Sequence, residues 1–409
     1  MTDPLSAREE WRRGWKLVIA ASSGMAVAPV IIYTMGLFVM PLEREFGWSR
    51  TTIIAGMTVN AVVVVILAGP VGALIDRFGP RRVAIPGVTL FCLSLGALAF
   101  LEGSLLHWWI AWGCIALSAV LTKATVWSAA IVSEFNSARG LALALALSGS
   151  AITGIVAPPI AQYLITEYSW RWAYAGMAFL WFCVPMTLIL LFFRSAGDVR
   201  RTQATAQRER SEMPGQDLVE AIRSAAFIKL AIACFLVILV VGSGVVNFVP
   251  MLAERGLDRS AAVPLASLVG LTTFVGRLVT GSLLDRFDPR IVGSLAFLMP
   301  GVACGLLIIH PHEMPFVIAA LTAVLIGASS GAELEVASYM SSRAFGLRNF
   351  GTLFGIIVGI IGLATGLGPL LASIGFDNFG SYDPGLWVSA AIAGAAALLL
   401  LTLPKLGPS

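Results

Sequence analysis

Residues 72–82 read GALIDRFGPRR, and residues 281–290 repeat the pattern as GSLLDRFDPR. The two copies lie 209 residues apart, which is about half of the 409-residue chain. Each copy ends a long apolar run and leads into a turn that contains proline. A repeat at half the chain length predicts two related halves, each with the same order of elements.

The composition places these halves in a membrane. Hydrophobic residues make up 58% of the chain and charged residues 12%, against roughly 25% charged residues in soluble domains. A helical span needs about 20 mostly apolar residues, and we predict twelve: Trp15–Pro41, Thr51–Ile75, Val83–Leu101, Leu105–Val132, Ala138–Ile165, Trp172–Phe193, Phe227–Met251, Ala261–Leu284, Ile291–Ile309, Met314–Met340, Phe350–Phe376 and Pro384–Leu401. Such runs are too long for barrel strands, so the predicted fold is all-α, with two pseudo-symmetric six-helix bundles.

A polar segment separates the two predicted bundles. We expect an N-terminal bundle at residues 1–193, a linker at 194–225 with an amphipathic turn near Leu218–Ile222, and a C-terminal bundle at 226–409. If the N-terminus is cytoplasmic, cytoplasmic segments hold 20 of the 27 Lys and Arg residues and the opposite side holds five. This bias predicts that the linker and both termini are cytoplasmic.

The repeated motif suggests a gate at the cytoplasmic mouth. Its carboxylates can pair with arginines or face the positive end of a helix dipole, and such a latch could close one conformation. The simpler interpretation is a basic loop that obeys the positive-inside rule. The candidate gating residues are Asp76, Arg77, Arg81, Asp285, Arg286 and Arg290.

The double motif, the twelve spans and the central linker resemble the major facilitator superfamily. This resemblance implies two six-helix bundles that rock about a central site. A narrower resemblance, to bacterial monocarboxylate transporters and oxalate/formate exchangers, rests on PLEREFGWSR (41–50), Phe135, RGLA (139–142), Ser148-Gly149, RAFGLRNFG (343–351), Gly368-Pro369 and DNFGSY (377–382).

Ionisable residues inside spans are candidates for function because burying each in lipid costs at least about 2.5–3.5 kcal/mol. Arg277 lies in the eighth span, and the residue 209 positions earlier is Ala68, so the repeated scaffold does not require a cation there. In the resembled family an arginine of this span binds the substrate carboxylate, which a guanidinium can grip with two parallel hydrogen bonds. The alternative is a purely structural pairing of Arg277 with a nearby glutamate.

Two glutamates of the tenth span are candidates for proton coupling. Glu335 matches Arg277 in depth, and Glu333 lies about 200° away around the same helix, so only one of them can face a central cavity squarely. A carboxylate beside an arginine can take up a proton when substrate neutralises that arginine. A structural salt bridge is the alternative, and the sequence leaves open which glutamate faces the cavity.

Lys123 of the fourth span aligns with residue 332, next to Glu333. It could pair with a glutamate across the cavity or form a second contact to an anion. The resembled families carry a functional lysine in the first or eleventh span, and this chain has neither. Further candidates for substrate contact are polar or aromatic residues within apolar runs, for which helix packing is an equal alternative: Tyr33, Trp127, Asn247, Asn60 and Tyr339.

These features predict a proton-coupled importer of a small organic monocarboxylate that works by alternating access. Exchange of organic acids and proton-driven efflux of drugs or metabolites are the alternatives, and a non-transporting receptor would need an added soluble domain. No nucleotide-binding P-loop motif occurs, so we do not expect ATP to drive transport. The spans hold no nucleophile–base constellation or metal-ligand cluster, so we expect no enzyme activity, cofactor or metal, and the net charge of +4 does not indicate nucleic acid. The expected partners are an organic anion, a proton and lipid, and the expected form is a monomer in a bacterial inner membrane.

Overall fold

The computed structural model describes residues 7–135, 139–193, 217–346 and 349–404. Every regular element in these ranges is helical, and twelve helical stretches are long and apolar enough to cross a membrane. The predicted all-α, twelve-span fold is therefore confirmed. The helices pack as two compact units, which we describe separately: unit 1 is Met1–Tyr33 with Val62–Ala206, and unit 2 is Thr34–Ala61 with Gln207–Ser409.

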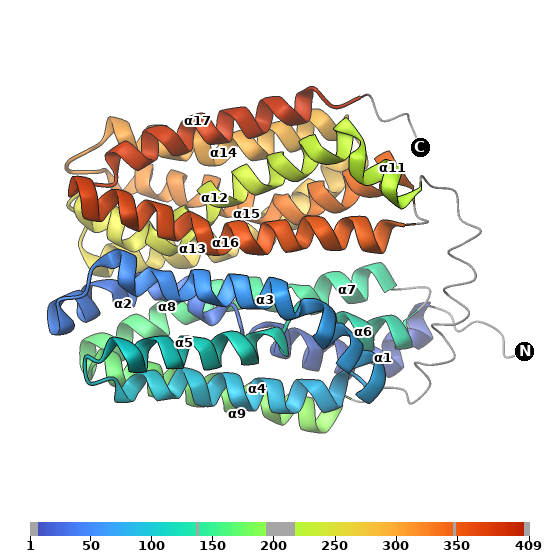
Figure 1. The fold of residues 1–409 in the computed structure, drawn as a ribbon, viewed down its shortest axis with the longest axis horizontal. Coiled ribbons are helices and arrows are strands. Elements are labelled where there is room, and N and C mark those ends of the chain that lie inside the picture. Colours follow the sequence, from blue (N-terminus) through green and yellow to red (C-terminus); the bar gives the residue numbers. More distant parts are fainter. Residues whose placement is uncertain (1–6, 136–138, 194–216, 347–348, 405–409) are drawn as a thin grey trace, which may run out of the picture. The chain divides into compact units, whose positions relative to one another are not determined.

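Unit 1 contains short helices where the sequence predicts long ones (Figure 1). The first predicted span is broken at residues 26–29, the fourth at 121–123 and the fifth at Ser148. The elements that lie wholly in unit 1 are α1 (Ala7–Met25), α4 (Pro80–Ala97), η1 (Leu98–Phe100), α5 (Leu105–Val120), α6 (Ala124–Glu134), α7 (Arg139–Leu147), α8 (Gly149–Glu167) and α9 (Trp170–Phe192).

Side chains replace the backbone hydrogen bonds that are lost at these breaks. The carbonyl oxygen of Ala26 accepts hydrogen bonds from Thr153 Oγ1 (2.7 Å) and Trp181 Nε1 (3.0 Å). At the second break, the carbonyl oxygen of Thr122 accepts one from Trp127 Nε1 (2.9 Å). Because a backbone group in lipid must be bonded within the protein, these donors make the breaks tolerable at membrane depth.

Unit 2 is built from longer helices. Each span of its C-terminal six is a single helix, and Figure 1 shows them running beside one another. They are α12 (Ala225–Glu254), α13 (Arg259–Leu284), α14 (Pro289–Ile309), α15 (Phe316–Phe345), α16 (Phe350–Phe379) and α17 (Asp383–Leu401). The short helix α11 (Leu218–Arg223) forms at the expected amphipathic turn, and Asp217 caps it by accepting from the N–H of Val219.

The two helices α2 (Val30–Phe46) and α3 (Arg50–Phe78) are shared between the units. Their facing portions, residues 34–61, pack within unit 2, although by sequence they belong to the first six spans. We call residues 34–61 the hairpin. The predicted division of the chain at residues 194–225 stays a prediction, since most of that segment lies outside the described residues.

Candidate functional site

The closest helix contact beside the in-span charges is between α13 and α15, and glycines make it possible. A Cβ atom on Gly331 would lie 2.2 Å from the carbonyl oxygen of Thr273 and 2.7 Å from the amide nitrogen of Arg277. One on Gly276 would lie 2.7 Å from the carbonyl oxygen of Ala328. Small residues at such positions allow two backbones to touch, and this contact fixes where the side chains that follow can point.

Arg277 and Glu335 meet directly beside this glycine contact. The Nε atom of Arg277 lies 3.6 Å from Oε1 of Glu335, and their side chains are 13% and 37% exposed. This is an ion pair whose carboxylate is accessible and whose cation is mostly covered. The pairing agrees with the equal depth expected of the two residues and leaves room for an anion to compete for the guanidinium.

Glu333 lies on the same helix, and its charge also interacts with that of Arg277. Its Oε2 atom is buried and has no hydrogen-bond partner among the described residues. The arginine therefore interacts with two carboxylates, of which Glu335 is within ion-pair distance. Unit 2 thus gathers one cation and two acids on neighbouring helices, and a role of these three residues in binding an anion and a proton stays a prediction.

Lys123 lies in unit 1, at the break between α5 and α6. It is the residue immediately before α6, and its side chain is partly buried. The sequence predicts Lys123 within a continuous span, whereas the structure places it at the start of a half-helix. Half-helix N-termini attract negative charge, so the break adds a partial positive charge to that of the lysine.

The remaining substrate candidates differ in how their polar atoms are used. Trp127 is fully buried and bonds to Thr122, and Asn247 is buried and bonds to Ser243 O (3.3 Å) and the Tyr382 hydroxyl (3.4 Å). Asn60 buries an Oδ1 atom that has no hydrogen-bond partner among the described residues. The other two are partly buried: Tyr33 lies in α2, and Tyr339 accepts a hydrogen bond from Arg343 (3.1 Å). Substrate contact stays a prediction for all five.

The structure gives side-chain hydrogen bonds for two of the candidate gating residues. Arg290 is held by Asp288, through Nη2 to Oδ2 at 2.7 Å and Nε to Oδ1 at 3.1 Å, and also donates to Leu403 O. Arg81 donates to the carbonyl oxygen of Leu190 at 2.8 Å. Three of the set are exposed, namely Arg77, Asp285 and Arg286, and the side chain of Asp76 lies outside the described part. A role of these residues in gating stays a prediction.

Comparison with known proteins identifies the family. The model of the Major Facilitator Superfamily matches residues 17–332 and 265–409. The chain belongs to this superfamily. It is 26% identical over 395 residues to Monocarboxylate transporter 13 of Bos taurus, covering 96% of this chain and 89% of the relative. It is 25% identical over 415 residues to Monocarboxylate transporter 11 of Homo sapiens, covering 97% and 84%.

A solved structure supports the same fold. A bacterial homologue of the human lysosomal transporter Spinster, in its inward-facing unoccupied conformation, matches with a TM-score of 0.69 at 15% identity, covering 99% of this chain and all of that one. This major facilitator protein is therefore a multi-pass secondary transporter and not an enzyme. The expected resemblance to monocarboxylate transporters is confirmed at the level of sequence similarity.

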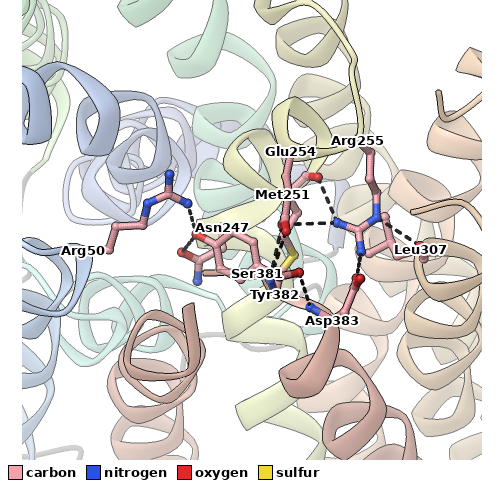
Figure 2. A network of polar contacts seen from close by, with 9 residues as sticks. All are labelled: Arg50, Asn247, Met251, Glu254, Arg255, Leu307, Ser381, Tyr382 and Asp383. Atoms are coloured by element: carbon pink, nitrogen blue, oxygen red, sulfur yellow. Dashed lines mark hydrogen bonds and ion pairs between the residues drawn. The ribbon is translucent and has the colours of Figure 1, made fainter. Parts of the chain in front are cut away.

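The structure of this transporter also shows a polar network that the sequence analysis missed (Figure 2). Arg255, only 1% exposed, donates to Leu307 O, Met251 O and the carboxylate of Asp383, and so joins the ends of α12, α14 and α17. Tyr382 links this cluster to Arg50 of the hairpin, since its amide faces Glu254 and its hydroxyl accepts from Arg50 at 3.0 Å.

A second repeat in the sequence points to this network. PLEREFGWSR at 41–50 aligns with PMLAERGLDR at 250–259, again 209 residues apart, with proline, glutamate, glycine and arginine at matching positions. The glycines, Gly47 and Gly256, both have positive φ angles, at 68° and 80°, so both copies make the same kind of turn before the next helix. The first copy is part of the family resemblance, and the second is seen only when the chain is compared with itself at the 209-residue offset.

Proposed function

We propose that this transporter carries a small organic monocarboxylate together with a proton, by alternating access, and that Arg277 binds the carboxylate. The observation that carries the proposal is the accessible ion pair between Arg277 and Glu335 on the tightly packed helices α13 and α15. A cation that is mostly covered but paired with an exposed acid can exchange that acid for a substrate anion. The names of the monocarboxylate transporter relatives support the same class of substrate.

The proton has its place on the same pair of helices. A carboxylate in a medium of low dielectric binds a proton more readily once a neighbouring cation pairs with another anion. A monocarboxylate on Arg277 would take the cation away from Glu335, and also weaken its effect on Glu333. Binding of the anion and uptake of a proton are then linked through one guanidinium, which gives symport.

Lys123 supplies a second positive charge in this proposal. It lies at the start of α6, where the helix dipole adds to its charge, and this makes it a second candidate contact for an anion, within unit 1. The distribution of Lys and Arg favours cytoplasmic termini. The resemblance to bacterial transporters favours a bacterial inner membrane as the location.

Replacing Arg277 tests the binding role. Arg277→Ala, in protein reconstituted in liposomes, should lose at least about 90% of the uptake of a radiolabelled monocarboxylate, because no second fork-shaped donor replaces the guanidinium. Arg277→Lys should recover little, since lysine cannot form the bidentate contact. Arg223→Gln, which removes an exposed charge from the short helix α11 of the same unit, is the control and should transport normally. Normal uptake by Arg277→Ala would contradict the proposal.

Replacing the glutamates separates symport from exchange. Glu335→Gln should retain exchange of internal for external substrate but lose accumulation driven by a pH gradient, because a neutral amide cannot carry the proton. Glu333→Gln is the comparison variant on the same helix, and the carboxylate whose loss removes accumulation is the coupling site. If both variants, and the double variant, still accumulate substrate when a proton gradient is imposed, proton coupling through this site is wrong.

A further inference from the structure

The hairpin of residues 34–61 is fastened to the rest of unit 2 through the N-terminus of α3. The carboxylate of Asp377, in the last turn of α16, accepts from the amide of Thr51 at 2.8 Å and from the amide of Arg50 at 3.3 Å. These are two of the first backbone N–H groups of α3, which have no partner within their own helix. A negatively charged cap at this position is favourable for the helix dipole, and here it comes from a helix more than 300 residues away in sequence.

The side chain of Arg50 makes a second attachment at the same place. It bonds to Glu43 of α2 through Nε at 2.8 Å and to the hydroxyl of Tyr382 through Nη1 at 3.0 Å. Its guanidinium also lies over the ring of Phe376, 3.6 Å from the centroid. Figure 2 shows Arg50 facing Tyr382, behind which lies the buried Arg255 cluster. The guanidinium of Arg50 therefore connects both helices of the hairpin to the turn between α16 and α17.

Arg259 makes a third attachment, from the opposite direction. Pro41 in α2 has no N–H, so the carbonyl oxygen of Leu37, four residues earlier, lacks its normal helical partner. The guanidinium of Arg259, the first residue of α13, donates to that oxygen. The carbonyl left free by a proline in the hairpin is thus satisfied by an arginine of the second half.

Arg50 and Arg259 are equivalent positions of the internal repeat. They are 209 residues apart, as are Pro41 and Pro250, and each arginine begins the helix that follows a matching turn. The carbonyl freed by Pro250 belongs to Val246, and Gly36 of the hairpin packs against it so closely that a Cβ there would lie 2.1 Å away. Each arginine reaches from its own half of the repeat to the other half.

We propose that Arg50 and Arg259 are a repeat-related pair of latches that hold the hairpin on unit 2, and that both must release for this end of the transporter to open. The hairpin belongs by sequence to the first half, so alternating access requires its contacts with the second half to form and break in each cycle. The distribution of Lys and Arg favours cytoplasmic termini, so the end at which Arg50 and Arg259 lie is the external one.

The chemistry of the contact fits a reversible role. Hydrogen bonds between protein groups exchange for hydrogen bonds to water at a modest net cost, so a polar latch at the end of a bundle can open where a packed apolar core cannot. Arg50 is 14% exposed, and water can reach it, whereas Arg255 behind it is 1% exposed and bonded on all sides to fixed groups. Arg50 is therefore suited to release, and Arg255 is suited to holding the ends of α12, α14 and α17 together.

A cysteine reporter at a buried position of the hairpin tests the latch directly. Met57 lies in the hairpin, is buried, and sits where α3 contacts α16, since the neighbouring Thr58 hydroxyl donates to Gly366 O at 2.7 Å. Met57→Cys, in a chain whose five native cysteines are replaced, is treated with a membrane-impermeant maleimide from either side of sealed vesicles. No substrate is needed, so the outcome is independent of the proposed carboxylate and proton.

The latch variants should expose this reporter from one side. Arg50→Gln combined with Asp377→Asn should raise its alkylation rate at least about tenfold, the effect of losing one charge-assisted hydrogen bond. The nearly isosteric single variants Asp377→Asn and Tyr382→Phe, and Arg259→Gln, should each raise it a few-fold. Glu102→Gln, which removes an exposed charge from unit 1, is the control and should react like the parent.

A second reporter separates release from general loosening of the fold. Cys234, fully buried in the core of unit 2, is kept as the sole cysteine in the same set of variants, and its rate should stay unchanged. Equal acceleration of both reporters would overturn the proposal, because it would mean that the residues only stabilise the fold. An unchanged alkylation rate of Met57→Cys in the Asp377→Asn and Tyr382→Phe variants would also overturn the proposal. These single variants provide the test if the double variant does not fold.

Discussion

The fourth and tenth spans occupy equivalent places in the two halves of the repeat, yet they are built differently. The fourth is two helices, α5 and α6, with a break at residues 121–123, whereas the tenth is the single 30-residue helix α15. The break is stabilised by one neutral donor, the indole of Trp127, and glycines allow α15 to pack closely against α13. A duplicated scaffold can therefore place a cation at a half-helix end in one copy and acids on an unbroken helix in the other.

The largest expected effect comes from filling the glycine contact of unit 2. Gly331→Val should destabilise the protein by about 3 kcal/mol, the upper part of the range for overpacking, because the added atoms would collide with the backbone of α13. Gly359→Val, on a helix face with open space around it, is the control. Equilibrium unfolding in detergent measures the free energy of unfolding of both variants. Equal values would show that α13 and α15 leave room for a side chain at position 331.

A smaller effect is expected from the donor at the break in unit 1. Trp127→Phe leaves the carbonyl oxygen of Thr122 without its indole partner and should cost about 1–2 kcal/mol more than Trp112→Phe. Trp112 is equally buried, and its Nε1 has no hydrogen-bond partner among the described residues, so the two changes remove the same volume but a different number of bonds. Equilibrium unfolding in detergent compares the two variants. Equal losses in the free energy of unfolding would mean that the hydrogen bond from Trp127 to Thr122 does not stabilise the break.

The smallest expected effect concerns pH and the network of unit 2. Burial raises the pKa of Tyr382 to about 12, although the neighbouring Arg50 acts in the opposite direction. A raised pKa in the folded state means that the stability contributed by the neutral phenol is fully present below pH 10 and is lost only as pH rises through about 12. The difference in the free energy of unfolding between the parent and Tyr382→Phe should therefore be the same at pH 6 and pH 9. A difference that changes between these values would show that the hydroxyl titrates in the native network.

The sequence predicts the membrane class and the span count well because these depend on the average apolarity of long segments and on one spacing that is repeated within the chain. It also predicts the depth of Arg277 and Glu335, which follows from counting residues along helices. It does not predict the breaks at 26–29 and 121–123. The first depends on donors from distant helices, such as Trp181 of α9, and the second on the orientation of the Trp127 indole, five residues after Thr122. The network around Tyr382 was missed for a different reason: its repeat is short, and only a search at the 209-residue offset shows it.

The attachment of the hairpin has a consequence for how the protein is made. Spans one and two leave the ribosome first, but Asp377 and Tyr382 are synthesised more than 300 residues later. Until Arg259 is made, the carbonyl of Leu37 has no guanidinium to satisfy it, and until α16 is inserted the start of α3 has no carboxylate cap. When the first half is expressed alone, residues 34–61 should therefore be poorly ordered in the bilayer. In the full chain, the last step of assembly is the docking of this hairpin on the end of α16 and on Tyr382. Such a contact forms slowly because its partners are far apart in the sequence.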